Sequence, residues 1–276
     1  MKIEQLMRPN NQDEYGILKL QNIILNMMKD IDEICTRHNI SYAIISGSAL
    51  GAVRHGGFIP WDDDFDIAMP RDEYDRFLTV CKEELPSDIY YVQESCKDWS
   101  LYFSKIRLKK TQLKENTQEI EIDKDNCGIF IDVFPLDNGA NLSFIRLWQY
   151  FCSKLLIAYG LRRRGIVQTG FIKKVMVFFS KPLQISWIHQ FFYRQCVSPK
   201  ETNTYADFFD IVRYKNVFIP KTQWGKPVYV PFETISLPVP EKTDTYLSSL
   251  YGNYMELPPK EQRKGTHYVE IDYGKY

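Results

Sequence analysis

The feature that most constrains the fold is the acidic segment at residues 62–66, Asp-Asp-Asp-Phe-Asp, which continues into Ile-Ala-Met. From Asp64 onward, acidic and apolar residues alternate. Successive side chains of a β-strand point to opposite faces, so this alternation predicts a strand with Asp64 and Asp66 on one face and Phe65 in the core. The two Cα atoms would lie ~7 Å apart, and carboxylates this close need a nearby cation or raised pKa values.

A third carboxylate is expected to join them from a neighbouring strand. Residues 128–134, Gly-Ile-Phe-Ile-Asp-Val-Phe, are typical of a buried strand, and Asp132 is its one charged residue. A carboxylate is costly to bury without a partner. Hard cations such as Mg²⁺ take carboxylate oxygens together with substrate phosphates. We therefore predict that Asp64, Asp66 and Asp132 form a catalytic site for Mg²⁺ or Mn²⁺, with two ions.

Two other interpretations of the acidic segment are weaker. A solvated acidic turn would leave the alternation with apolar residues unexplained. A calcium-binding loop would place four acids at its first, third, fifth and twelfth positions, namely Asp62, Asp64, Asp66 and Glu73. However, its sixth position is Ile67, where the sharp turn needs glycine, and Pro70 interrupts the ninth position.

A phosphate-binding turn is predicted just before the acidic strand. Gly47 and Ser48 follow a predicted strand at 42–46, and at the start of a helix their N–H groups and hydroxyl suit a phosphate. Arg54 and His55 follow in a predicted loop with two glycines. An isolated pair of this kind usually lies on the surface, but beside a metal site we expect it to contact phosphate.

Three further residues are candidates for substrate contacts. Lys105 and Arg107 are two apart on a predicted strand, 101–108, so both point to the same face. That face is directed either at a diphosphate or at solvent. Trp61 adjoins the acids, and either packs under a quaternary ammonium group or anchors the core.

The remaining patterns predict a mixed α/β (α+β) fold. Apolar residues at helical spacing predict helices at 15–38, 72–85, 144–159, 171–193 and 244–251, the last ending before Gly252. Short apolar or alternating runs predict strands at 42–46, 64–69, 90–93, 101–108 and 128–134, with β-like runs at 228–230 and 235–237.

Composition limits the cellular location and the kinds of binding partner that we expect for this protein. Basic and acidic residues both number 35, so charge gives no reason to expect nucleic acid as a partner. The six cysteines are scattered without a Cys-x-x-Cys pair, which argues against a zinc site or a disulfide scaffold. With no secretory signal pattern and no long apolar run, we expect a cytoplasmic protein with reduced thiols.

The predicted helices at 144–159 and 171–193 combine bulky aromatic residues with lysine and arginine. Such helices suit peripheral attachment to the inner face of a cell membrane. Alternatively, the aromatic residues form the core of a helical subdomain that covers the site.

The segment 46–67, Ser-Gly-Ser-Ala-Leu-Gly-Ala-Val-Arg-His-Gly-Gly-Phe-Ile-Pro-Trp-Asp-Asp-Asp-Phe-Asp-Ile, resembles the signature of the LicD family. This family of phosphotransferases has a nucleotidyltransferase core like that of DNA polymerase β and is related to fukutin and fukutin-related protein. The resemblance continues through 105–108 and 130–136, and reappears at 246–255 and 257–259. Ser46 replaces a further glycine common in relatives, and Phe65 replaces their usual Ile or Val.

The resemblance implies that Gly47 and Ser48 contact phosphate and that Asp64, Asp66 and Asp132 bind metal. It also implies an enzyme that transfers a phospho-alcohol, most often phosphocholine from CDP-choline, and releases CMP. The acceptor that the resemblance implies is a hydroxyl of a cell-surface glycan, such as a lipopolysaccharide or teichoic-acid precursor, which is either free or lipid-linked. Two alternatives remain open, namely transfer of a nucleoside monophosphate from a triphosphate, and a catalytically silent glycan-binding relative.

These patterns divide the chain into four parts. We expect a polar tail at 1–14, a nucleotidyltransferase-like catalytic core at 15–137 and a helical, aromatic-rich subdomain at 138–220. The last part, 221–276, contains many prolines and is predicted to pack as a cover on the core.

Overall fold

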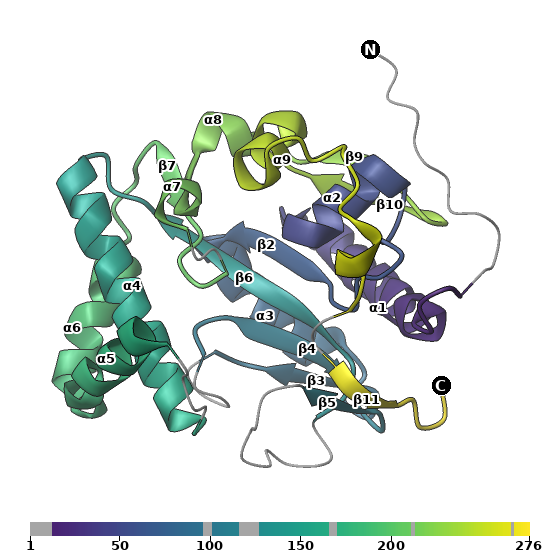
Figure 1. Ribbon diagram of the computed structural model, residues 1–276, viewed down its shortest axis with the longest axis horizontal. Coiled ribbons are helices and arrows are strands. Elements are labelled where there is room, and N and C mark those ends of the chain that lie inside the picture. The colour runs from purple at the N-terminus through teal and green to yellow at the C-terminus, as the bar shows by residue number, and fades with distance from the viewer. Residues whose placement is uncertain (1–12, 96–100, 116–126, 166–169, 211–212, 266–267) are drawn as a thin grey trace.

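A mixed β-sheet forms the centre of the protein in the computed structural model, which describes residues 13–95, 101–115, 127–165, 170–210, 213–265 and 268–276. The strands run in the order β1-β2-β6-β4-β3, and β7 and β8 extend the sheet from the end of β6 (Figure 1). Strands β2 and β6 are parallel, whereas the other pairs are antiparallel. The bounds are β1 Ala43–Ile44, β2 Asp66–Pro70, β3 Tyr90–Gln93, β4 Ser104–Leu108, β6 Phe130–Asn138, β7 Thr204–Ala206 and β8 Phe218–Pro220.

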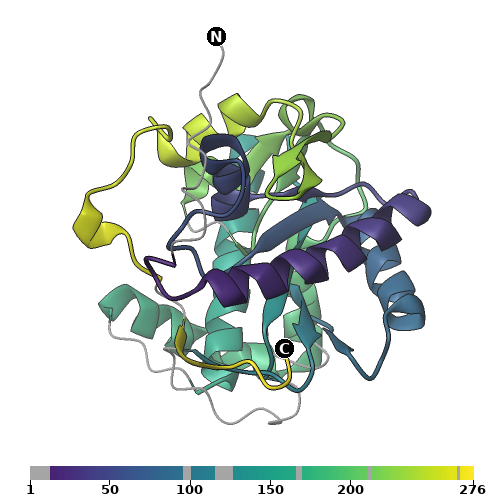
Figure 2. The ribbon, with the colours of Figure 1, turned by 90° about the vertical axis from the view of Figure 1, so that its right-hand side faces the viewer.

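Two long amphipathic helices cover one face of this sheet. Helix α1 (Leu18–Arg37) crosses in front of the strands in Figure 2, and α3 (Arg71–Glu84) lies beside it. Their buried side chains recur at three- and four-residue intervals, as the predicted helices at 15–38 and 72–85 require. The predicted mixed α/β fold is confirmed.

Helix α2 (Ser46–His55) corrects one prediction, because Arg54 and His55 belong to its last turn and not to a loop. Ala49, Leu50 and Ala52 are buried, so the helix is held by its apolar side. It ends at Gly56, whose φ of 69° is in the left-handed region that glycine adopts without a Cβ clash.

The helical region after β6 is confirmed at 144–159 but is wrong in part at 171–193. One helix, α4 (Ser143–Arg163), fills the first segment and extends beyond it. The second divides into α5 (Phe171–Phe179), the 3₁₀ turn η2 (Lys181–Gln184) and α6 (Ser186–Cys196). Pro182 has no backbone N–H to donate, and its ring would clash with the preceding turn of a continuous helix. A second hydrophobic core forms here, in which α4 and η2 contribute buried side chains.

The end of the chain returns to the first core. The hairpin of β9 (Val228–Phe232) and β10 (Ile235–Val239) and helix α9 (Thr243–Tyr251) pack near α2 (Figure 1). Strand β11 (Tyr268–Asp272) pairs with β5 (Gln112–Glu115), a pairing that the patterns did not predict. The short elements α7 (Tyr214–Val217), α8 (Lys221–Trp224) and η3 (Lys260–Gln262) complete the described part.

The division into four parts stays a prediction, and residues 1–12 of the polar tail lie outside the described residues. Five cysteines in the described ranges are free thiols, while Cys96 falls in a gap. Among the described helices, none combines the length and apolar character needed to cross a lipid bilayer.

Candidate active site

Two neighbouring strands bring Asp66 and Asp132 together. In the parallel pair β2 and β6, Asp66 is the register partner of Asp132, and the Asp132 N–H donates to the carbonyl oxygen of Phe65 at 2.9 Å. Register partners point to the same side of a sheet, so both carboxylates project together. Phe65 and Ile67 are fully buried, as the alternation requires. The adjacency expected for these two aspartates is therefore present.

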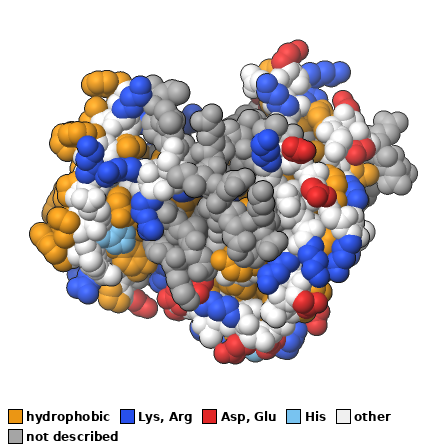
Figure 3. Space-filling view, turned by 90° about the horizontal axis from the view of Figure 1, so that it is seen from below, with side chains coloured by type: hydrophobic (Ala, Val, Ile, Leu, Met, Phe, Trp, Pro, Cys, Tyr) orange, Lys and Arg blue, Asp and Glu red, His pale blue; other side chains and the backbone are white. Residues whose placement is uncertain are grey.

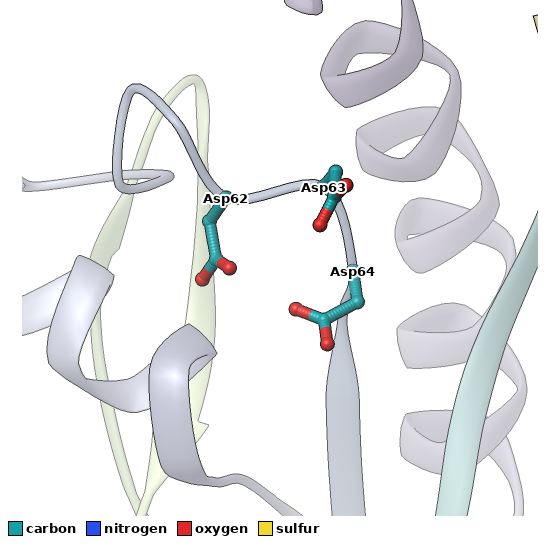
Figure 4. Close-up of side chains that lie close together, drawn as sticks. All are labelled: Asp62, Asp63 and Asp64. Carbon is teal, nitrogen blue, oxygen red and sulfur yellow. The ribbon is translucent and has the colours of Figure 1, made fainter. Parts of the chain in front are cut away.

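Asp64 lies just before β2 and not within it, so the predicted strand begins two residues too early. The carboxylate oxygens of Asp62, Asp63 and Asp64 come within 4.8 Å of one another, and Figure 4 shows Asp62 and Asp64 directed into the same space. Asp63 is buried against Gly265, where an added Cβ would meet its Oδ2 at 2.7 Å.

The alternatives for the acidic segment do not fit this arrangement. A calcium loop would need residues 62–73 to wrap around one ion, but Asp66–Pro70 form a strand and α3 begins at Arg71. Glu73 instead pairs with Arg76 at 2.8 Å. A solvated turn is also wrong, because Asp66 belongs to a central strand.

Gly47 and Ser48 lie in the first turn of α2, next to the acids. The Ser48 hydroxyl accepts a hydrogen bond from the Asp66 N–H at 3.0 Å, which ties the helix start to β2. An added Cβ at Gly47 would meet Asp62 Oδ2 at 2.7 Å, so a larger residue here would displace the Asp62 carboxylate. Contact with a substrate phosphate stays a prediction for both residues.

A further pair of acids, which the sequence patterns did not single out, comes from the segment after β7. Asp210 accepts a hydrogen bond from the Ser46 hydroxyl at 2.8 Å. Asp207 is buried, its Oδ1 accepts from the Asp210 N–H at 3.2 Å, and its Oδ2 has no hydrogen-bond partner. The run Ala-Asp-Phe-Phe-Asp at 206–210 carries the same signal as Asp132, namely acids within an apolar stretch.

The concentration of carboxylates changes their acidity. Burial, and then the charges of Asp64, Asp210 and Asp132, raise the pKa of Asp66 well above its ordinary value. Burial also raises the pKa of Asp132 to about 6, although Lys105 acts in the opposite direction. The pKa of Asp210 is raised by burial and by Asp64. Bringing these acids together as carboxylates is therefore unfavourable unless a cation offsets their charge.

The residues fit a divalent metal. Asp132 Oδ1 is buried and forms an ion pair with the Lys105 ammonium at 2.8 Å, and the carboxylate has further lone pairs with which to bind a cation. An all-oxygen donor set of closely spaced carboxylates is the chemistry that Mg²⁺ and Mn²⁺ prefer. Asp62, Asp64, Asp66, Asp132 and Asp210 are the acids from which such a set would come.

Lys105 and Arg107 are buried, so the solvated-face interpretation is wrong. Besides its pairing with Asp132, Lys105 lies 3.2 Å from the centroid of the Phe130 ring. Arg107 donates to Gln93 Oε1 at 2.7 Å and to the carbonyl oxygen of Gly128 at 3.1 Å. Lys105 thus adjoins the acids, and the predicted diphosphate contact of both residues remains untested.

The C-terminal segment contacts Arg54 and Trp61, and His55 lies beside Arg54. Arg54 is buried, so the surface interpretation is wrong, and its Nη1 donates to the carbonyl oxygen of Tyr254 at 2.8 Å. Its Nε lies 3.0 Å from the Nε2 of His55. Trp61 is half-buried against the first core, and the guanidinium of Arg263 lies 5.5 Å from its ring centroid. The Trp61 ring is therefore already in contact with a cationic side chain of the same chain, that of Arg263.

A mixed sheet with acids on adjacent strands, next to a short helix that carries Gly47 and Ser48 in its first turn, is the arrangement of a nucleotidyltransferase-like fold. Residues 39–151 match the family model described as "LicD/FKTN/FKRP, nucleotidyltransferase domain". This part of the chain is therefore similar to the nucleotidyltransferase domain of the LicD family.

Individual relatives extend this match along the chain. The protein is similar to the lipopolysaccharide cholinephosphotransferase LicD of Haemophilus influenzae, with 28% identity over 260 residues that cover 91% of this chain and 95% of the relative. An uncharacterized protein of Rickettsia prowazekii is 50% identical over 90 residues, covering 26% of this chain and 34% of the relative. One of Rickettsia typhi is 48% identical over 57 residues, covering 21% and 18%.

Proposed function

We propose that the protein is a metal-dependent phosphotransferase that moves a phospho-alcohol, phosphocholine from CDP-choline in the first instance, to a glycan hydroxyl and releases CMP. The observation that carries the proposal is the clustering of Asp64, Asp66 and Asp132 at the start of two paired strands. Similarity over nearly the whole length to a cholinephosphotransferase that is named for lipopolysaccharide supports the transferred group and the acceptor class.

In the proposed reaction the acceptor hydroxyl oxygen forms a bond to the phosphorus that carries the alcohol. The bond from that phosphorus to the CMP oxygen breaks, and CMP leaves with the electron pair. A bound Mg²⁺ or Mn²⁺ pair would neutralise the diphosphate and the charge that develops on the leaving group. The phosphoryl group itself needs mainly positioning and electrostatic stabilisation.

The chain's own residues have distinct proposed tasks. Asp64 and Asp66 would hold metal, and Asp132 would share that role and accept the proton of the acceptor hydroxyl. The Oδ1 of Asp132 lies 2.8 Å from the Lys105 ammonium, which fixes the position of this carboxylate. Lys105 would meet the diphosphate from the side of Asp132, and the first turn of α2 would face it with N–H groups.

A cytoplasmic location at the inner face of a membrane is proposed together with this activity, because both the CDP-activated donor and a lipid-carried glycan precursor would be available there. Nucleotidyl transfer from a triphosphate is the second candidate, since the family model itself is described as a nucleotidyltransferase domain. The two reactions release different products, CMP and pyrophosphate.

The deciding experiment incubates the protein and a lipopolysaccharide-type acceptor with CDP-choline, CDP-ethanolamine, CDP-glycerol, CDP-ribitol or CTP, in Mg²⁺ or Mn²⁺. We expect metal-dependent release of CMP, fastest with CDP-choline. Asp66→Asn should abolish it, whereas Asp88→Asn, a matched change at an exposed position, should not. Pyrophosphate release from CTP, or full turnover by Asp66→Asn, would reject the proposal.

The same assay tests Trp61. If its ring packs under the trimethylammonium of choline, Trp61→Ala should raise the KM for CDP-choline about tenfold or more and leave that for CDP-glycerol nearly unchanged. Equal effects on both donors would assign Trp61 to the packing seen with Arg263.

A further inference from the structure

Helix α5 is apolar over most of its length and yet buries none of its side chains completely. Phe171 and Ile172 at its start are 81% and 77% exposed, and Phe178 and Phe179 at its end are more than half exposed. A nine-residue helix has little stability of its own, and a surface helix normally buries its apolar side. The exposed side chains of α5 therefore indicate a partner that covers them.

The neighbouring helices extend this surface. On α4, exposed apolar residues recur at intervals of three and four and so lie on one side of the helix, namely Phe144, Leu147, Trp148 and Phe151. On α6, Trp187 and Phe191 are exposed one turn apart. The Trp148 ring packs 6.2 Å from that of Phe192, and its Nε1 donates to Gln195, which joins the α4 and α6 surfaces.

We call this surface, on α4, α5 and α6, the aromatic face. It lies at one end of the molecule, where Figure 3 shows hydrophobic side chains interspersed with lysine and arginine. Exposed apolar patches of this extent are rare on monomeric proteins and usually mark an interaction site.

Charge identifies the kind of partner. From Asn138 through Lys200 the sequence has ten lysines and arginines and no aspartate or glutamate, although the whole chain is neutral. Arg162 and Arg163 at the end of α4, and Lys173 and Lys174 within α5, are exposed. The face therefore fits a surface that is both apolar and anionic. A second copy of the chain would present the same positive charge and be repelled.

A polar pocket adjoins the aromatic face. It measures about 190 Å³ and is lined by Tyr102, Tyr159, Arg163, Gln184, Ser186 and His189. Ser186 lies between Ile185 and Trp187 in sequence, and both of these side chains are exposed. A polar pocket that contains Arg163, next to exposed apolar groups, is suited to the phosphate of a phospholipid headgroup.

We propose that the aromatic face binds the surface of a membrane that contains anionic phospholipid. Helix α5 lies in the interface, its aromatic residues reach the acyl boundary, and the surrounding lysines and arginines meet lipid phosphates. Attachment through this face is of the peripheral kind, in which helices lie on the bilayer surface. This binding does not rest on the transferase activity proposed above, and it is measured without substrate.

The test is flotation of the full-length protein with vesicles of phosphatidylcholine alone, or with phosphatidylglycerol added. We expect binding to the anionic vesicles that weakens at high salt. Phe171→Ser with Ile172→Ser should remove most of the apolar insertion into the membrane. Lys173→Glu with Lys174→Glu should remove most of the electrostatic attraction to anionic lipid. Each double variant should bind the anionic vesicles about tenfold more weakly or worse. Val228→Ser, and Lys29→Glu with Lys226→Glu, alter exposed positions elsewhere and should have no effect.

A second measurement does not depend on disruptive variants. Brominated lipid should quench tryptophan fluorescence on binding, and the conservative change Trp187→Phe should reduce this quenching. Equal recovery in the soluble fraction with both vesicle types would overturn the proposal. A second result would also overturn the proposal, namely that the protein binds no vesicles and is a dimer without lipid, and that Phe171→Ser with Ile172→Ser converts this dimer to monomer. The aromatic face would then be an interface between two copies of the chain.

Discussion

Neutralising Asp66 should stabilise the metal-free protein while it abolishes transfer. Asn keeps the shape of the side chain and removes one charge from a position where Asp64, Asp132 and Asp210 all raise the carboxyl pKa. Most substitutions at partly buried positions destabilise a protein. A gain in stability at this position would therefore identify repulsion between carboxylates as the dominant effect.

The magnitude follows from the sheet. Asp66 and Asp132 are register partners on adjacent strands, which lie about 4.8 Å apart, so their charges are separated by roughly 5–6 Å. At that separation the repulsion is about 3 kcal/mol at an effective dielectric constant of 20, and below about 1 kcal/mol in water. A gain of about 2 kcal/mol corresponds to roughly 4–8 °C in Tm for a chain of this size.

Urea and thermal unfolding in EDTA and in excess Mg²⁺ provide the assay. The wild-type protein should gain stability from Mg²⁺, by about 2.7 kcal/mol when the ion is at 100 times its Kd, and Asp66→Asn should lose most of that gain. The exposed change Asp88→Asn is the control. A variant that is less stable than wild type in EDTA and responds to Mg²⁺ as wild type does would refute the proposed repulsion and the metal role of Asp66.

Two further predictions concern Asp132 and Asp210. Because the folded-state pKa of Asp132, about 6, exceeds its usual 3.8, its contribution to stability is greatest below about pH 4 and falls by about 3 kcal/mol as pH rises through 6. In EDTA, the stability of Asp132→Asn should not show this fall with rising pH. The pH dependence is compared, and not the stability at one pH, because the variant also loses the ion pair with Lys105. Asp210→Asn should lower kcat about tenfold or more without reducing stability in EDTA, and unchanged kcat would place Asp210 outside the site.

The patterns that predicted the adjacency of Asp66 and Asp132 are local. A buried strand with an alternating acid needs only its own residues to be recognised, and a carboxylate in an apolar run such as Asp132 implies a partner on a neighbouring strand. This is why the adjacency of Asp66 and Asp132 followed from sequence. The boundaries did not follow, because the start of β2 at Asp66 depends on its pairing with β1 and β6.

What the sequence did not reveal depends on contacts between distant segments. Asp210 reaches the site from the segment after β7 and is held there by the hydroxyl of Ser46, 164 residues earlier. The spacing of Lys105 and Arg107 likewise does not determine whether their side chains are solvated or buried. They are buried because β4 lies between β3 and β6, inside the sheet.

The C-terminal segment explains why similarity to the family returns near the end of the chain. Helix α9 packs against α2, and the Ser46 N–H donates to the buried Tyr246 hydroxyl at 3.3 Å. Beyond α9, the carbonyl oxygen of Tyr254 holds the Arg54 guanidinium at 2.8 Å. Both ends of α2 are thus fixed by residues about 200 positions later. Because the Nη1 of Arg54 is directed at the chain's own backbone, this arrangement favours a positioning role for Arg54. The segment around α9 also helps to place Gly47 and Ser48 beside the acids.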